Sequence, residues 1–429
     1  MARWHAGQRQ GFILLAHYLL LTFLIAWSAA GLRRSTTENA ASERFVDTSE
    51  AFELAEAGLD QASRWLRSQP GPPVGTQPFD PFNGAIAIPS GTVTVTIDPD
   101  DANPISYLDL YTVTAIGQVN GINITRQLTS LLQTVSFARY SYFSNFERQP
   151  SGTPIWFTSF DHLTGPVHSN DRFNIAGTPI FDGAMSSVAS SVNYKNPPPP
   201  EGNNPAFNGG LTLNTTAVTL PLTATSLRTA AQGASGAWFE GNTVVVLQAN
   251  GTMLVTNAAK GWVNQPQPLP ANGALFVNGG NVTVSGTLDG QLTIGTSNDV
   301  LLSNNIMYKD DPKVTPSSND LLGLVAEQNV VVSASAPADM TIQASVMALA
   351  SSFTVENWWV GPPKGTLSVY GGIIQDRRGP VGTFNSATGL KQSGYSKDYQ
   401  YDTRLSALAP PFYPTTGTYR TVAWMDGSN

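Results

Sequence analysis

One polar cluster in the body of this sequence contains histidine together with a possible nucleophile. Its members are Asp161, His162, His168, Ser169, Asn170 and Asp171. Serine, histidine and an acid are the residue types of nucleophilic hydrolysis. Adjacent residues of a strand point to opposite faces, so His168 and Ser169 would not face one substrate. No Gly-x-Ser-x-Gly turn surrounds Ser169. We therefore expect His168 and Asn170 to bond turn backbone, and we predict no catalytic residue and no enzymatic activity.

Metal chemistry has few candidate ligands. Cysteine is absent, and the histidines are His5, His17, His162 and His168. This composition excludes disulfides, thiolate chemistry and a three-histidine site in the body of the chain. Two oxygen-rich runs, 98–103 and 310–311, resemble calcium sites in composition, but neither matches a complete loop with its turn glycine. We interpret them as solvated turn acids, and we predict neither a metal nor a cofactor.

The densest basic stretch is 376–378, Asp-Arg-Arg, with three lysines nearby in the sequence: Lys364, Lys391 and Lys397. A DNA-binding protein needs such a patch. Arg377 and Arg378 are therefore candidate nucleic-acid contacts, although a salt-bridged surface is the favoured interpretation. The whole chain has 23 basic and 30 acidic residues, hence a net charge of −7, and a pI near 5.1. It is not a uniformly basic nucleic-acid binder.

The composition favours a mainly β fold. Only 12% of the 429 residues are charged, about half the usual share of roughly 25%, which excludes disorder caused by high charge. The 39 glycines and 30 prolines suit many short strands joined by turns.

The elements that must position these residues begin with a long apolar segment. Residues 12–32 contain no Asp, Glu, Lys or Arg. A helix of that length spans about 30 Å, the thickness of bilayer hydrocarbon, so we predict a transmembrane segment. The alternative is a secretory signal peptide over 1–30, because the small residues 28–30 are suitable for cleavage.

A second helical pattern follows directly. Six apolar residues recur at helical spacing: Phe45, Phe52, Ala55, Leu59, Ala62 and Leu66. A helix over 12–69 should end at Gln69, because Pro70-Gly71-Pro72-Pro73 cannot continue it. Its second half is amphipathic, which is suited to packing on a sheet or on copies of itself.

Residues 74–136 are predicted to form a small antiparallel sheet under this helix. Strands are expected at 92–98, 111–119 and 122–132, with Asn120-Gly121 as a two-residue hairpin turn. A last strand over 419–425 is expected to return to this sheet. The aromatic-rich junction 137–160 is interpreted as a hydrophobic plug, and the alternative is an aromatic platform for carbohydrate.

Residues 161–380 are predicted to form a β-solenoid. Short apolar pairs are separated by Gly, Asn and Ser, and Val282, Val300, Leu322 and Ile342 are predicted to lie on one face at steps of about 20 residues. A β-sandwich is the alternative fold. The proline-rich run 196–202 is a linker or loop, and 221–235 is a short helix outside the coils. The tail 381–429 is expected to cap a solenoid end.

The N-terminus resembles that of PilX-type minor pilins of type IV pili. Gln10-Gly11-Phe12 is similar to a prepilin peptidase site, with 1–11 as leader and cleavage between Gly11 and Phe12. Arg33-Arg34-Ser35-Thr36-Thr37 and Ala51-Phe52 with Ala55-Glu56-Ala57-Gly58-Leu59 carry the rest of the resemblance. It implies an assembly helix that includes Ala16, Phe45, Phe52, Glu56, Leu59 and Leu66. Most major pilins have Glu at the fifth mature position, here Ala16, which suits a minor subunit.

The body also resembles a group of pilin-like surface proteins with a β-helical ectodomain. The runs 165–170, 175–181, 365–375 and 394–405 carry this resemblance, which implies no activity. Together these patterns predict a minor pilin-like subunit whose solenoid serves adhesion or capture. It would cross the inner membrane once, with its C-terminal domain outside the cytoplasm, and reach the cell surface by assembly.

The predicted partners are prepilin peptidase, other pilins, the inner-membrane assembly machinery, the membrane, and a surface glycan or DNA. Two alternatives remain open at this point. One is an exported β-helix enzyme acting on polysaccharide, and the other is a DNA-uptake pilin.

Overall fold

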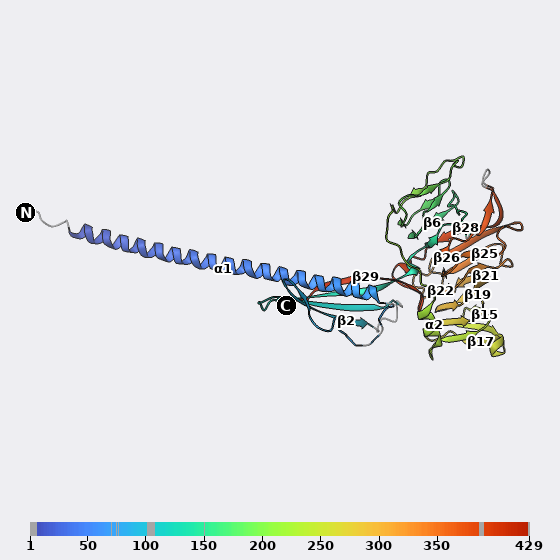
Figure 1. Cartoon of the computed structure of the whole chain (residues 1–429), viewed down its shortest axis with the longest axis horizontal. Helices are drawn as coiled ribbons and strands as arrows, with labels where there is room; N and C mark the ends of the chain where they lie inside the picture. Colours follow the sequence, from blue (N-terminus) through green and yellow to red (C-terminus); the bar gives the residue numbers. More distant parts are fainter. Residues whose placement is uncertain are drawn as a thin grey trace, which may run out of the picture. The chain divides into compact units, whose positions relative to one another are not determined.

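The computed structural model describes residues 7–69, 71–73, 75, 77–100, 108–149, 151–385 and 390–427. The chain divides into two compact units (Figure 1). The first, which we call the helix–sheet unit, takes the chain up to Asp100, then Leu110–Leu132 and the end from Thr421. The second, which we call the coil unit, takes Asp101–Asp109 and Gln133–Arg420.

The helix–sheet unit contains one long helix, α1 (Gly7–Ser68). No proline interrupts this stretch, and prolines at 70, 72 and 73 follow it. The helix ends one residue before the predicted Gln69. The prediction of one continuous helix with an apolar first half is confirmed.

The sheet of this unit has the order β1-β2-β3-β4-β29. Its strands are β1 (Ile86–Ile88), β2 (Gly91–Asp100), β3 (Leu110–Val119), β4 (Thr125–Ser136) and β29 (Thr415–Asp426). β2 pairs with β1 and β3 in antiparallel register, for example Val95 with Ala115. β29 adds the last strand of the chain beside β4, as the sequence indicated.

The predicted two-residue turn at Asn120-Gly121 is wrong. The connection runs from Asn120 to Ile124, and the Val119 N–H donates to the Ile124 carbonyl at 3.4 Å. Only Gly121 of these residues has a positive φ, 74°, whereas a type I′ turn requires two such residues.

The coil unit is a stack of mostly parallel strands arranged in three faces. The first face contains β14 (Ala237–Glu240), β18 (Ala274–Asn278), β20 (Gln291–Thr296), β22 (Leu321–Ala326), β24 (Met340–Ala348), β26 (Pro363–Arg377), β5 (Tyr142–Phe146), β7 (Val167–Ser169), β10 (Met185–Ser187) and β13 (Leu211–Thr212), in that order. Neighbours in this face pair in parallel, for example Leu324 with Val346 and Ile373 with Tyr142.

The second face uses the other halves of the long strands. It runs through β19 (Val282–Leu288), β21 (Val300–Tyr308), β24, β26, β28 (Lys391–Gln400), β6 (His162–Leu163), β9 (Ile180–Phe181) and β12 (Ala206–Phe207). The third face contains β15 (Thr243–Gln248), β19, β21, β23 (Val330–Val332) and β25 (Phe353–Val355). This in-register parallel pairing is what a β-solenoid requires, whereas a β-sandwich is antiparallel.

The remaining elements are short or antiparallel. β16 (Thr252–Asn257) and β17 (Trp262–Pro268) extend the third face beyond β15, and β27 (Gly382–Phe384) pairs with β28. β8 (Asn174–Ile175) pairs with β11 (Asn193–Tyr194). The 3₁₀ helices are η1 (Phe137–Arg139), η2 (Ala258–Lys260) and η3 (Thr403–Ser406).

The register of the coils differs from the sequence-based one. Val282 pairs with Val300, Val300 with Val330 and Val330 with Phe353, while Leu322 pairs with Leu292 and Ile342 with Val369. Leu322 and Ile342 therefore lie on other faces than Val282 and Val300. The prediction was wrong because the coils differ in length and each contributes strands to three faces. A single average spacing therefore assigns residues of different faces to the same face.

The tail also differs from its prediction as an end cap. Residues 391–400 form β28, a member of the stack. The following segment buries Tyr401, Leu405, Ala409 and Tyr413 against outward-facing residues of the first face such as Phe276 and Ile374. The predicted short helix exists as α2 (Thr225–Gln232), whose Leu227 and Ala231 join the same cluster. The tail thus covers a lateral face, because that face carries apolar side chains on its outer side as well.

Candidate functional site

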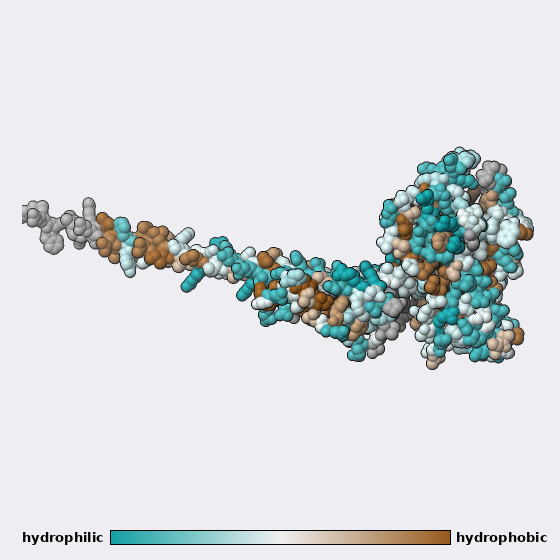
Figure 2. Space-filling model, viewed as in Figure 1, coloured by the Kyte–Doolittle hydropathy of each residue, from teal (hydrophilic) through white to brown (hydrophobic). Residues whose placement is uncertain are grey.

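Residues 12–32 of α1 are exposed and mostly apolar. Figure 2 shows hydrophobic residues along this part of the helix, and Phe12 is 75% exposed. Ala16, the fifth residue after the predicted cleavage position, is exposed too. A stretch of this helix is long and apolar enough to cross a membrane. Residues 1–6 of the predicted leader lie outside the described residues, whereas Gly11 and Phe12 lie within α1.

The second half of α1 packs on its sheet mainly through small residues. Its buried positions are Ala51, Leu54, Ala55, Gly58, Ala62 and Leu66. A Cβ at Gly58 would lie 2.5 Å from Val93 Cγ2, so the backbone of the helix approaches β2 closely. Large side chains would hold the helix away from the sheet, and the small ones therefore fix its position.

The predicted assembly residues divide into three kinds. Leu66 is buried in the helix–sheet unit, and Phe52 and Leu59 are half-buried. The Phe52 ring packs edge-to-face on Trp424 of β29 with centroids 6.0 Å apart. Glu56 is exposed, and Phe45 is 74% exposed. Phe45 therefore does not belong to the buried stripe, because the sheet does not extend under it.

Arg378, one of the two candidate nucleic-acid contacts, forms a salt bridge inside the coil unit, and a salt bridge was the favoured interpretation of this stretch. Its side chain is buried, with a relative exposure of 5%, and its Nη1 lies 3.0 Å from the carboxylate of Glu147, which is fully buried. Arg377 is half-buried, with its guanidinium 4.3 Å from the Phe146 ring centroid and 3.6 Å from Asp376. Aromatic and acidic neighbours in the coil unit account for both cations.

The three lysines near this stretch are likewise engaged. Lys364 donates to the carbonyls of Ala334 and Ala336 at 2.8 and 2.9 Å, and burial lowers its pKa. Lys391 donates to the carbonyls of Lys364 and Gly365, and Lys397 pairs with Asp161. A cluster that is basic in sequence is therefore a set of internal contacts in the structure.

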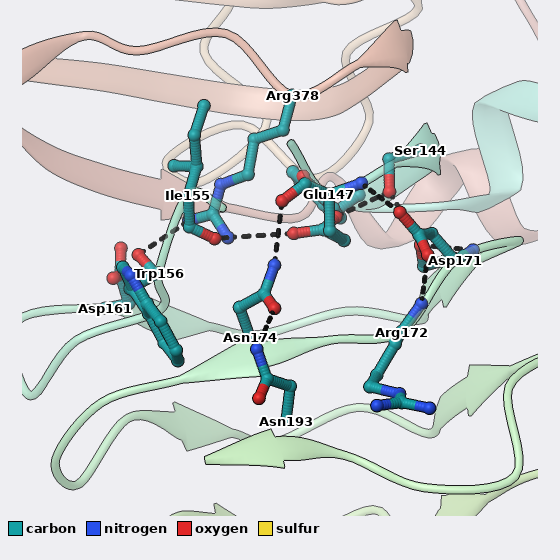
Figure 3. A network of polar contacts seen from close by, with 12 residues as sticks. Ser144, Glu147, Ile155, Trp156, Asp161, Asp171, Arg172, Asn174, Asn193 and Arg378 are labelled. Carbon is teal, nitrogen blue, oxygen red and sulfur yellow. Dashed lines mark hydrogen bonds and ion pairs between the residues drawn. The ribbon is translucent and has the colours of Figure 1, made fainter. Parts of the chain in front are cut away.

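Glu147 is the centre of a buried polar network (Figure 3). Its carboxylate accepts hydrogen bonds from Tyr142 at 2.8 Å and from Ser144, besides pairing with Arg378. Its backbone carbonyl accepts from Asn174 at 2.8 Å, and the Asn174 side chain accepts from Asn193 at 2.7 Å. The network ties β5 to the next coils on one side and to the end of β26 on the other.

A second buried ion pair lies beside this network. Burial alone would raise the pKa of Asp161, but Lys397 and Arg378 outweigh it and hold the pKa below its usual value. Its carboxylate also accepts from the Thr158 N–H at 2.6 Å. Burial lowers the pKa of the Lys397 ammonium despite the attraction of Asp161. These charges are balanced, with two cations (Arg378 and Lys397) facing two carboxylates.

In the histidine cluster, the backbone bonding expected for both His168 and Asn170 is found for Asn170 only. His168 forms two side-chain hydrogen bonds. Its Nδ1 lies 2.8 Å from Ser186 Oγ, and its Nε2 lies 3.0 Å from Asn170 Oδ1. Asn170 bonds the backbone of Val218 at both its N–H and its carbonyl. Ser169 instead bonds Ser144 at 2.9 Å. The structure thus separates His168 from Ser169, and burial lowers the pKa of His168. Among the described residues no group of three or more His, Asp or Glu is arranged to hold a metal ion.

A cleft of about 630 Å³ opens beside the two ion pairs. Aromatic residues contribute much of its lining: Tyr142, Trp156, Phe157, Phe160, Phe353, Trp358, Phe384 and Tyr399. Pro197–Pro200 of the proline-rich run also line it, as do Lys195 and Glu201. The predicted aromatic junction therefore contributes both to a core, through Phe137 and Phe143, and to this cleft.

Sequence reasoning missed the cleft and its buried charges. Glu147 follows a run of aromatic and small residues, and Asp161 was grouped with the histidine cluster, so neither position by itself indicates a buried ion pair. Their partners Arg378 and Lys397 lie more than two hundred residues further along the chain. No local spacing could pair them.

Comparisons with known proteins give limited resemblance. Residues 107–190 match a family described as a domain of unknown function (DUF4900). A search of curated proteins gave no match. Among solved structures, the chain is similar to the competence-associated pilin ComZ from Thermus thermophilus at 11% identity, over 89% of this chain and 97% of that one, with a TM-score of 0.35.

Proposed function

We propose that this chain is a minor pilin-like subunit of a type IV pilus or related secretion filament. Residues 12–32 would hold it in the inner membrane, with the coil unit outside the cytoplasm, until assembly carries it to the cell surface. Its partners would then be prepilin peptidase, other pilins and the inner-membrane assembly machinery. The coil unit would serve adhesion or capture rather than catalysis.

One observation carries this proposal. A single unbroken helix has its second half fixed to a sheet by small residues, while its residues 12–32 are exposed and carry no Asp, Glu, Lys or Arg. Such a surface is stable against lipid or against other apolar helices, and not in water. A pilin-like chain would first be held in the membrane, where lipid covers this surface. After assembly, the apolar helices of neighbouring subunits would cover it.

Sequencing of the mature N-terminus tests the proposal. Full-length protein from membranes and from sheared surface fibres is expected to begin at Phe12 in both fractions. The variant Gly11→Val should retain the leader and be absent from fibres, while Gly7→Val, a control within the same leader, should be processed normally. A mature chain that begins near Gly31 and is found only in the soluble exported fraction would support the exported-enzyme alternative and reject this proposal.

The DNA-uptake alternative gains no specific support from the coil unit. Its candidate contact Arg378 is buried against Glu147, and the neighbouring lysines bond carbonyls or Asp161. We therefore do not prefer it.

A further inference from the structure

We propose that the cleft lined by Trp156, Phe160, Trp358, Phe384 and Tyr399 binds an uncharged oligosaccharide. The cleft of about 630 Å³ lies within the range of roughly 300–1,000 Å³ typical of ligand sites. The inference deepens the proposed function, because it names what a displayed coil unit would capture.

The charges around the cleft favour a neutral ligand. Arg378 and Lys397 are neutralised by Glu147 and Asp161 within the coil unit. The remaining charged residues that line the cleft are Lys195 and Glu201, one of each sign. A nucleic acid or another polyanion would meet no excess of positive charge here, so binding through released counterions is not available.

The polar groups of the cleft include donors without partners. The Gln375 side chain is nearly fully buried and its Oε1 accepts from the N–H groups of Phe353 and Gly379, but its Nε2 has no hydrogen-bond partner among the described residues. The Tyr399 hydroxyl also has none within the described part of the chain. Neither donor atom is among the fully enclosed polar atoms that lack a partner, so both are open to water or to a ligand in the cleft. Sugar hydroxyls can accept such bonds and donate others.

The mouth of the cleft presents aromatic rings to solvent. Phe160 is 61% exposed, and its ring is stacked on Phe384 with centroids 6.0 Å apart and planes inclined by 13°. Trp156 lies nearby in the lining, with the Lys195 ammonium 5.9 Å from its ring centroid. A pyranose has C–H groups on its faces and hydroxyls at its rim. The aromatic rings can pack on the C–H faces, and the hydrogen-bond donors can bond the hydroxyls. The exposed ring of Phe160 and the half-buried ring of Phe384 offer a sugar an apolar face on which to pack.

The test uses the full-length protein in lauryldimethylamine oxide, a detergent without a sugar headgroup. Tryptophan fluorescence is titrated with cellohexaose, maltohexaose and N-acetylchitohexaose, because Trp156 and Trp358 report on the cleft. At least one of the three is expected to bind saturably with a Kd below about 1 mM. Failure of all three to bind at that level would overturn the inference, as would binding of a proline-rich peptide without any of the sugars.

Variants then assign the binding to the cleft. Phe160→Ala should weaken it at least about tenfold, as expected for an exposed aromatic contact of an interface. Tyr399→Phe keeps the ring and should weaken binding severalfold through loss of the hydroxyl. Phe45→Ala is the matched control, since Phe45 is also largely exposed but belongs to the helix–sheet unit, and it should bind as wild type. Unchanged affinity in both cleft variants would also overturn the inference.

The two proposals fail separately. Protein that begins at Phe12 and enters fibres, yet binds none of the sugars, contradicts the cleft assignment alone. Protein that binds sugar but is exported with its N-terminus near Gly31 contradicts the filament proposal alone.

Discussion

The guanidinium of Arg378 lies 3.0 Å from the carboxylate of Glu147, although 231 residues separate them in the chain. Arg378 follows β26, and Glu147 follows β5, the strand that pairs with β26 in parallel. The ion pair therefore joins the coils at 142–212 to those at 237–400, which are stacked out of sequence order. Its guanidinium also covers the Phe157 ring at 3.6 Å from the centroid.

Removing the cation should destabilise the coil unit strongly. In Arg378→Met, the buried carboxylate of Glu147 keeps its bonds from Tyr142 and Ser144 but loses its charge partner. An uncompensated buried charge costs about 3–5 kcal/mol. We expect a loss of that size in the free energy of unfolding of the coil unit, measured by urea denaturation of the full-length chain.

The neighbouring arginine provides the control. Arg377→Met removes a partly exposed pair with Asp376 and should cost less than about 1 kcal/mol. The double variant Arg378→Met, Glu147→Leu removes both charges and should recover much of the loss. Equal effects of the two single arginine variants would show that the buried pair does not hold these coils together.

Acid should weaken the same junction through Asp161. Lys397 and Arg378 hold the pKa of the folded Asp161 carboxyl below its ordinary value of about 3.9. A lowered folded pKa contributes stability that is present above the unfolded pKa and is lost as the pH falls through the folded pKa. Wild-type protein should therefore lose coil-unit stability below about pH 4.

The variant Asp161→Asn tests the source of that loss. It should be less stable at pH 7, where Lys397 is left unpaired, and its stability should fall less steeply on acidification. Adding Lys397→Met should restore part of the stability at pH 7. The measurement is the unfolding midpoint between pH 7 and pH 3, and an identical acid dependence of wild type and Asp161→Asn would contradict the assignment.

The helix–sheet unit could be predicted closely because its signals are local. An uncharged stretch, a proline-rich stop and alternating strands each identify an element within its own window. The predicted last strand over 419–425 is likewise found in this sheet, as β29. The extent of the buried stripe was not predicted, since Phe45 has helical spacing but lies beyond the sheet.

The parallel coils of the coil unit were predicted, but the order in which its strands pair was not. Parallel coils were expected from short apolar pairs, yet β5 pairs with β26, which follows it in the chain by more than two hundred residues. Arg378 illustrates the consequence, because its neighbours in sequence indicated a basic surface while its neighbours in space are Glu147 and Phe157. Non-local pairing decides burial here, and no window of sequence contains it.

Close packing of α1 on its sheet should be sensitive to one added methyl group. A Cβ at Gly58 would lie 2.5 Å from Val93 Cγ2, 3.0 Å from Ala115 Cβ and 3.3 Å from Val95 Cγ2. Overpacking of this kind costs about 1–3 kcal/mol, so Gly58→Ala should lower the unfolding free energy of the helix–sheet unit.

Gly31→Ala is the matched control in the same helix. No heavy atom of the described structure lies within 4 Å of a Cβ at Gly31, so alanine meets no obstruction there. Its higher helix propensity should stabilise the helix by about 1 kcal/mol. Thermal unfolding followed by circular dichroism compares the two, and an equal gain for both variants would refute the close approach at Gly58.

A charge in the middle of the apolar half of α1 should impair membrane retention. Leu21 is exposed and lies near the centre of 12–32. Arginine at the centre of a transmembrane helix costs about 2.5–3.5 kcal/mol, which corresponds to a partition weakened on the order of a hundredfold. Leu21→Arg should thus move the protein from carbonate-washed membranes to the soluble fraction, as measured by immunoblotting. Phe45→Arg introduces the same charge at another exposed position of the helix, beyond the span, and should leave retention unchanged. If both variants remain in the membrane to the same extent as wild type, residues 12–32 are not the anchor. A charge at position 21 would then have no measurable cost, although the proposal places that position in the bilayer.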